Sequence, residues 1–210
     1  MALTNKLSAM SRRAAITAAA LAAMATLAGC SPKGASVAEG DMAKGAPEGA
    51  KVTVVEYASV TCGHCAVWNA QVWPEFKTKY VDNNKVRFVF REFPTPPQDI
   101  AAAGFLIARC AGPDKYFDVV HDIMAAQSEW AAGVQPRVSL YRIGQAAGLS
   151  TEQIDACVRD KDAIAAMEKR IQAGIAAGVS GTPSFFVNGV KVNDITMAGL
   201  SAAVDAELAK

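Results

Sequence analysis

A pair of cysteines, Cys62 and Cys65, lies directly between a strand-like stretch and a helix-like stretch of the chain. The preceding residues 52–57 form a nearly unbroken run of β-branched and apolar side chains, which is typical of a strand covered on both faces. The sulfur of Cys62 would face the start of the following helix, where free N–H groups and the helix dipole favour a thiolate. Because a thiolate is the species that attacks disulfides, this arrangement predicts a redox-active pair.

The hydrophobic pattern predicts one α/β domain over residues 51–210. The cysteine pair should open a helix over 62–80, which Pro74 bends or breaks, and a second strand should follow over 86–93. Strand, helix and strand in this order indicate a right-handed parallel βαβ unit.

A helical block is expected at about 97–178, before strands return near the end of the chain. A capping box at 150–153 opens one of its helices, and another has an apolar stripe formed by Ile164, Met167, Ile171 and Ile175. The dipeptide Asn188-Gly189 is a strong hairpin signal and predicts two short strands around it, before a last amphipathic helix.

The N-terminal residues 1–29 have the pattern of a targeting segment. Three basic residues precede an uncharged run over 14–28, which is short for a membrane span. The run closes with Leu-Ala-Gly-Cys and resembles the lipobox of bacterial lipoproteins, which implies cleavage before Cys30 and lipid on that cysteine. The alternative is an ordinary secretory peptide in which Cys30 falls by chance. The glycine-rich residues 30–50 are expected to form a flexible tether.

The cysteine count agrees with export. The chain has five cysteines, so lipid on Cys30 would leave an even number, as exported proteins prefer. Acidic and basic residues balance, with 20 of one and 21 of the other, and no basic stripe stands out. Nucleic acid is therefore not an expected partner.

Over residues 51–210 the chain resembles the thioredoxin fold in its DsbA-like form. The resemblance rests on strand–CxxC–helix, a helical insertion, and Gly181-Thr182-Pro183 leading a hairpin. It implies a βαβ…ββα fold with an inserted helical subdomain. Gly63 and His64 between the cysteines also resemble the dipeptide of protein disulfide isomerase.

The resemblance implies roles for the residues around the pair. Cys62 would be the nucleophile and Cys65 the buried resolving thiol. His64 would place a donor or a positive charge near the Cys62 thiolate. Glu56 matches a buried acid of DsbA-like proteins and would relay protons to Cys65. The alternative for Glu56 is a strand-end carboxylate exposed to water.

Thr182 and Pro183 resemble the cis-proline loop that faces the cysteine pair in this fold. The loop would present backbone groups of Thr182 to an extended substrate, whereas an ordinary trans proline is the alternative. Gly63 replaces the proline that is usual in the DsbA dipeptide. Thr182, which is more typical of disulfide isomerases, replaces the valine that is usual in DsbA oxidases. These two departures leave the direction of the reaction open.

Some DsbA-like proteins carry a second, structural disulfide in the helical block. By that resemblance we expect a bridge between Cys110 and Cys157, the alternative being two buried free thiols. No metal site is expected, because there is no second CxxC and His121 is the only other histidine.

Together these features predict an exported thiol–disulfide oxidoreductase, most simply a dithiol oxidase that needs no cofactor. We expect it to be a monomer in the periplasm, either anchored by lipid or soluble. Its partners would be cysteine-containing exported proteins and a membrane or envelope redox partner. A disulfide isomerase or reductase, a metal-binding lipoprotein using Cys62 and Cys65, and a non-catalytic peptide-binding module remain as alternatives.

Overall fold

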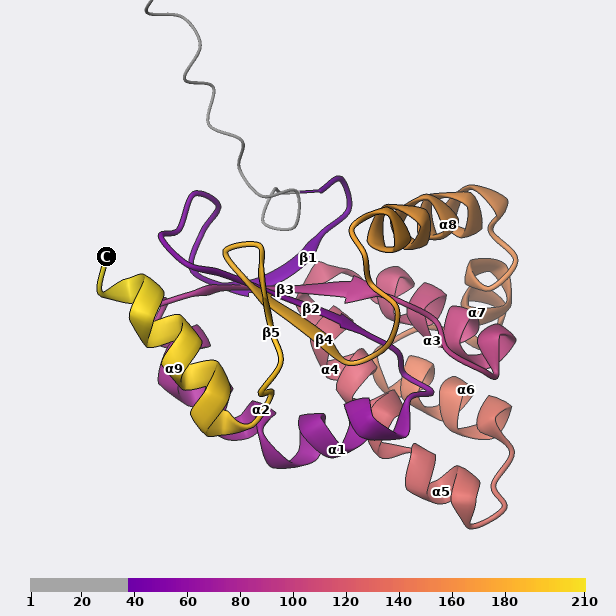
Figure 1. Ribbon diagram of the computed structural model, residues 1–210. Helices are drawn as coiled ribbons and strands as arrows, with labels where there is room; N and C mark the ends of the chain where they lie inside the picture. The colour runs from indigo at the N-terminus through magenta and orange to yellow at the C-terminus, as the bar shows by residue number, and fades with distance from the viewer. Residues whose placement is uncertain (1–37) are drawn as a thin grey trace, which may run out of the picture. The chain divides into compact units, whose positions relative to one another are not determined.

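The computed structural model describes residues 38–210, which form a mixed five-stranded sheet with helices on both sides (Figure 1). The strands follow the order β1-β3-β2-β4-β5 across the sheet. Their bounds are β1 Met42–Gly45, β2 Thr53–Ala58, β3 Arg87–Glu92, β4 Ser184–Val187 and β5 Val190–Val192. Among the strands of residues 38–210, β2 and β3 pair in parallel and the other three pairings are antiparallel.

The connection between β2 and β3 confirms the predicted βαβ unit. The expected single helix is divided into α1 (Gly63–Gln71), α2 (Trp73–Phe76) and the π-helical turn η1 (Lys77–Val81). The break falls just before Pro74, as predicted, because proline has no N–H to donate and fits only the first turn of a helix.

The helical insertion lies between β3 and β4 and contains six helices. They are α3 Gln98–Cys110, α4 Pro113–Ala125, α5 Gln127–Ala131, α6 Pro136–Ala146, α7 Thr151–Cys157 and α8 Lys161–Ala176. The capping box at the start of α7 is confirmed, with Ser150 as its N-cap. The predicted stripe of α8 is wrong at its end, since Ile175 is 50% exposed. The short helix α5 was not predicted.

The central strand β2 is buried on both faces, as its apolar run predicts. Val54 belongs to the larger core, which includes Trp68 of α1 and side chains of the C-terminal helix α9 (Met197–Leu208). Val55 and Tyr57 belong to a smaller cluster on the other face. There α8 approaches closely, because a Cβ at Gly174 would lie only 3.0 Å from the Tyr57 ring. Figure 1 shows α1 and α9 on one side of the sheet and α8 on the other.

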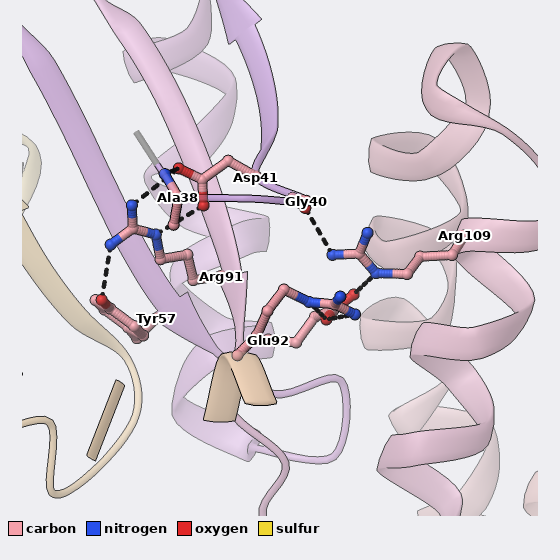
Figure 2. A network of polar contacts seen from close by, with 8 residues as sticks. Ala38, Gly40, Asp41, Tyr57, Arg91, Glu92 and Arg109 are labelled. Carbon is pink, nitrogen blue, oxygen red and sulfur yellow. Dashed lines mark hydrogen bonds and ion pairs between the residues drawn. The ribbon is translucent and has the colours of Figure 1, made fainter. Parts of the chain in front are cut away.

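The prediction of a flexible tether over residues 30–50 is wrong in part, because strand β1 lies inside that range and pairs with β3. An ion pair between Asp41 and Arg91, at 2.8 Å, fixes the start of the strand, and Arg109 binds the carbonyl of Gly40 (Figure 2). Gly45 is required by geometry, because its φ is +83° and a Cβ there would lie 2.5 Å from the Val86 carbonyl oxygen. Glycine is therefore required at this position by the close approach of the β3 side of the sheet to the end of β1. Residues 30–37 lie outside the described part.

Candidate active site

Cys62 is the N-cap of α1 and stands at the end of the turn that follows β2. Its sulfur accepts a hydrogen bond from the backbone N–H of Cys65 at 3.3 Å. Its thiol donates to the backbone carbonyl of Thr182 at 3.4 Å. The fold therefore brings together the two motifs that the sequence singled out, although they lie 120 residues apart.

The two thiols of the pair differ strongly in acidity. The pKa of Cys62 is lowered from 9.0 to about 5, first by a hydrogen bond from the Cys65 thiol. The Thr182 side chain and the N–H groups of Cys65 and His64 lower it further, while partial burial works in the opposite direction. Burial, followed by the bond to Cys62, raises the pKa of Cys65. The pair thus combines a thiolate at neutral pH with a buried, protonated thiol.

His64 contributes to this site through its backbone N–H, which is one of the groups that lower the pKa of Cys62. Its side chain is exposed, at the start of α1. The expected electrostatic action of the imidazole stays a prediction.

Glu56 lies on β2 and is only 3% exposed, so the alternative of a water-exposed strand end is wrong. Its pKa is raised to about 8, first by burial and then by the charge of Cys62. The carboxyl group is therefore protonated at neutral pH. The charge of an ionised Glu56 in turn raises the pKa of Cys65, so the two groups interact electrostatically. Proton transfer between them stays a prediction.

The Thr182–Pro183 peptide bond is cis, as the resemblance implied. A second cis bond, Pro96–Pro97, was not predicted and lies in the segment between β3 and α3. Hydrogen bonds tie this segment to the turn before Cys62: Thr61 donates to the Thr95 carbonyl at 2.8 Å, and the Thr95 N–H donates to the Ser59 hydroxyl at 3.0 Å. In the sequence, the hydroxyl residues Ser59 and Thr61 just before the cysteine pair were the feature that could have indicated this contact.

The structure joins Cys110 and Cys157 in a disulfide, the pairing that the resemblance implied. The bridge links the last residues of α3 and α7 and leaves Cys62 and Cys65 as free thiols. Cys30 falls outside the described residues.

Two properties of residues 38–210 concern the alternative functions. In that range, no three His, Cys, Asp or Glu side chains are grouped so that they could hold a metal ion. Within the same residues, no helix combines the length and the apolar character needed to cross a bilayer.

Comparison with known proteins identifies the family. Residues 37–206 match the sequence profile of a family described as Thioredoxin, and the chain belongs to this family. A Rickettsia bellii protein, provisionally named protein-disulfide oxidoreductase, is 39% identical over 171 residues. The match covers 80% of this chain and 64% of that protein, so the chain spans less than two thirds of the relative's length.

Solved structures show the same fold. Alpha-DsbA1 of Wolbachia pipientis superimposes with a TM-score of 0.75 at 23% identity, covering 82% of this chain and 93% of that one. A thioredoxin-like oxidoreductase of Silicibacter pomeroyi gives a TM-score of 0.63 at 28% identity, covering 81% and 93%. The fold is therefore thioredoxin-like, with a helical insertion as in DsbA proteins.

Proposed function

We propose that this chain is a thiol–disulfide oxidoreductase that oxidises pairs of cysteines in exported proteins. One observation carries the proposal: the sulfur of Cys62 caps α1 and has a pKa near 5, whereas the buried sulfur of Cys65 stays protonated. Stabilising the thiolate stabilises the dithiol form of the pair relative to its disulfide. A pair of this kind readily accepts electrons from other thiols.

In the first step, a substrate thiolate attacks the sulfur of Cys62 in the oxidised pair. The bond between Cys62 and Cys65 breaks, and a mixed disulfide between substrate and Cys62 forms. Cys65 leaves with the electron pair and takes a proton from Glu56, which is protonated at neutral pH. Cys62 is the point of attack because it is the more exposed of the two cysteines.

In the second step, another substrate thiolate attacks the substrate sulfur of the mixed disulfide. Cys62 leaves as a thiolate, which its low pKa makes a good leaving group. Two electrons have then passed from the substrate dithiol to the cysteine pair. Glu56 regains its proton from solvent, so that Cys65 carries one of the two protons released by the substrate and the other stays in solvent because Cys62 remains ionised. An oxidised redox partner in the membrane or envelope would remove the two electrons.

Thr182 supports oxidation as the direction of the reaction. Its side chain donates to the Cys62 sulfur and lowers the pKa of that thiol, so it favours the reduced form of the pair. The same residue would bind a substrate backbone beside Cys62, and the 3.4 Å distance between its carbonyl oxygen and the sulfur supports this role. Isomerase or reductase action would use the same groups, but with a reduced pair supplied to the reaction.

The proposed place of action is the periplasm, as a monomer held to the membrane by lipid on Cys30. The lipobox-like residues before Cys30 support the lipid anchor, and the Cys110–Cys157 disulfide supports the periplasm as the compartment. Such bridges persist in oxidising compartments and are rare in the cytosol of mesophiles. The substrates would be cysteine-containing proteins of the same compartment.

Trapping tests the assignment of the two cysteines. The variant Cys65→Ser removes the group that resolves a mixed disulfide formed by reaction of Cys62, so it should accumulate disulfide-linked substrate complexes in cell envelopes. The matched variant Cys62→Ser should trap none. Equal trapping by both variants, or none by either, would overturn the proposal.

Stoichiometric transfer tests the direction. The oxidised protein is mixed with a reduced peptide that contains two cysteines, and both products are measured by mass spectrometry after acid quenching. Most of the peptide should become oxidised while the pair at 62 and 65 becomes reduced. A pair that stays oxidised at equilibrium would show that the protein is a reductant.

A further inference from the structure

Gln127 is the first residue of α5 and reaches out of the helical insertion to the turn that carries Cys62. Its side-chain amide nitrogen donates to the backbone carbonyl of Val60 at 2.8 Å and to that of Cys62 at 3.2 Å. An amide group has two N–H donors, so both can be engaged at once. Gln127 is itself only partly exposed.

The two carbonyls belong to the turn that aims the Cys62 sulfur. Strand β2 ends at Ala58, and the N–H of Cys62 then donates to the carbonyl of Ser59 at 3.2 Å. Val60, inside this turn, is fully buried. The carbonyl of Cys62 also accepts the N–H of Ala66 at 3.0 Å, the bond that begins α1. Gln127 therefore binds the chain at the junction of turn and helix.

Holding this junction matters for the thiolate because its stabilising contacts come from the helix start. The sulfur lies 3.3 Å from the Cys65 N–H only while Cys62 keeps its N-cap conformation, with φ −83° and ψ 117°. A rotation about ψ of Cys62 moves its carbonyl and the N–H groups of α1 relative to the sulfur. The Gln127 amide opposes that rotation and also offsets the partial negative charge of the two carbonyl oxygens that it binds.

We propose that Gln127 is a positioning residue for the Cys62 thiolate, through which the helical insertion raises the oxidising power of the pair. The inference rests on the proposed function. It assigns to α5 a role in tuning the acidity of Cys62, which lies 65 residues earlier in the chain.

The test is the pH profile of Cys62 alkylation by iodoacetamide in the full chain, reduced, as wild type and as Gln127→Met. Methionine keeps the length of the side chain and removes both donors. The pKa of Cys62 should rise by about one unit. A shift of this size corresponds to the free energy of about one hydrogen bond, here one that holds Cys62 in its N-cap conformation. The equilibrium constant against glutathione should move about tenfold toward a less oxidising pair, which corresponds to about 30 mV.

Gln145→Met is the matched control, because Gln145 is an exposed glutamine of α6 that donates to Thr151. It should leave the pKa and the equilibrium of the pair unchanged. A second variant, Gln127→Glu, keeps the shape but faces the two carbonyls with a carboxylate. It should raise the pKa of Cys62 further than Gln127→Met does.

The outcomes separate this inference from the proposed function. An alkaline pKa of Cys62 in the wild type would overturn the proposed function itself. A wild-type pKa near 5 that stays the same in both Gln127 variants would overturn only the role of Gln127. A lower melting temperature of Gln127→Met without a change of pKa or equilibrium constant would mean that the residue supports the fold alone, and would equally overturn the inference.

Discussion

The ionised sulfur of Cys62 should make the stability of the reduced protein depend on pH in a way that the oxidised protein does not share. The pKa of Cys62 is about 5 in the fold, against 9.0 without the fold's contacts. Because the folded value is the lower one, the stabilisation is complete above pH 9 and is lost as the pH falls through 5. The oxidised protein has no thiol at this position and lacks this contribution.

The size of the effect follows from the two pKa values. A fully effective thiolate would stabilise the reduced fold by about 2.7 kcal/mol at pH 7 and by about 0.4 kcal/mol at pH 5. The sulfur is partly exposed and its interactions are screened, so we expect a gain of about 1 kcal/mol between these pH values. For a chain of this size that corresponds to about 2 to 4 °C in melting temperature.

Thermal unfolding of both redox forms at pH 5, 6 and 7 measures this gain. The difference, reduced minus oxidised, should grow with pH. Using the difference is essential, because burial is the first cause of the shifted pKa values of Glu56 and His121 and makes the stability of both redox forms depend on pH. The variant Cys62→Ser should follow the oxidised protein. A difference that stays constant from pH 5 to 7 would refute a thiolate stabilised by the fold.

Two further predictions concern Glu56 and the second disulfide. Glu56→Gln should stabilise the protein by about 2 to 3 kcal/mol at pH 7 and not at pH 4.5, because the raised pKa means that the wild-type fold loses stability as the pH rises from 4.5 to 8. In stopped-flow measurements the same variant should slow the step in which Cys65 leaves by at least about tenfold, and an unchanged rate would remove Glu56 from proton transfer. Replacing Cys110 and Cys157 by alanine should destabilise the fold by about 2 to 4 kcal/mol in urea, since the bridge spans 47 residues. Disulfide exchange by the pair should remain, and loss of exchange at a temperature where the variant is folded would contradict a purely structural bridge.

The parts of the fold that the sequence predicts well are those with strong local signals. The run that became β2, the proline that separates α1 from α2 and the hairpin at Asn188-Gly189 each specify their conformation within a few residues. Glu56 was found by its offset from Cys62, and its burial follows from a strand that is covered on both faces.

The parts that sequence reasoning missed depend on distant partners. Strand β1 is short and lies next to glycines, so only its pairing with β3 and the Asp41–Arg91 ion pair make it a strand. In the sequence, Gln127 looks like any surface glutamine. Its role depends on the packing of the helical insertion against the turn before Cys62, which only the folded structure shows. Neither contact leaves a periodic or compositional pattern in the sequence.

If Cys30 carries lipid, as proposed, the pairing of β1 would also limit how far this domain could move from a bilayer. With lipid on Cys30, a free linker up to residue 50 would extend about 70 Å, whereas a chain fixed from Asp41 onward has at most about 40 Å. The catalytic domain would then sample a thin layer above the membrane surface. Proteins emerging from that surface, with their cysteines still reduced, would meet Cys62 sooner than those already released into the surrounding space.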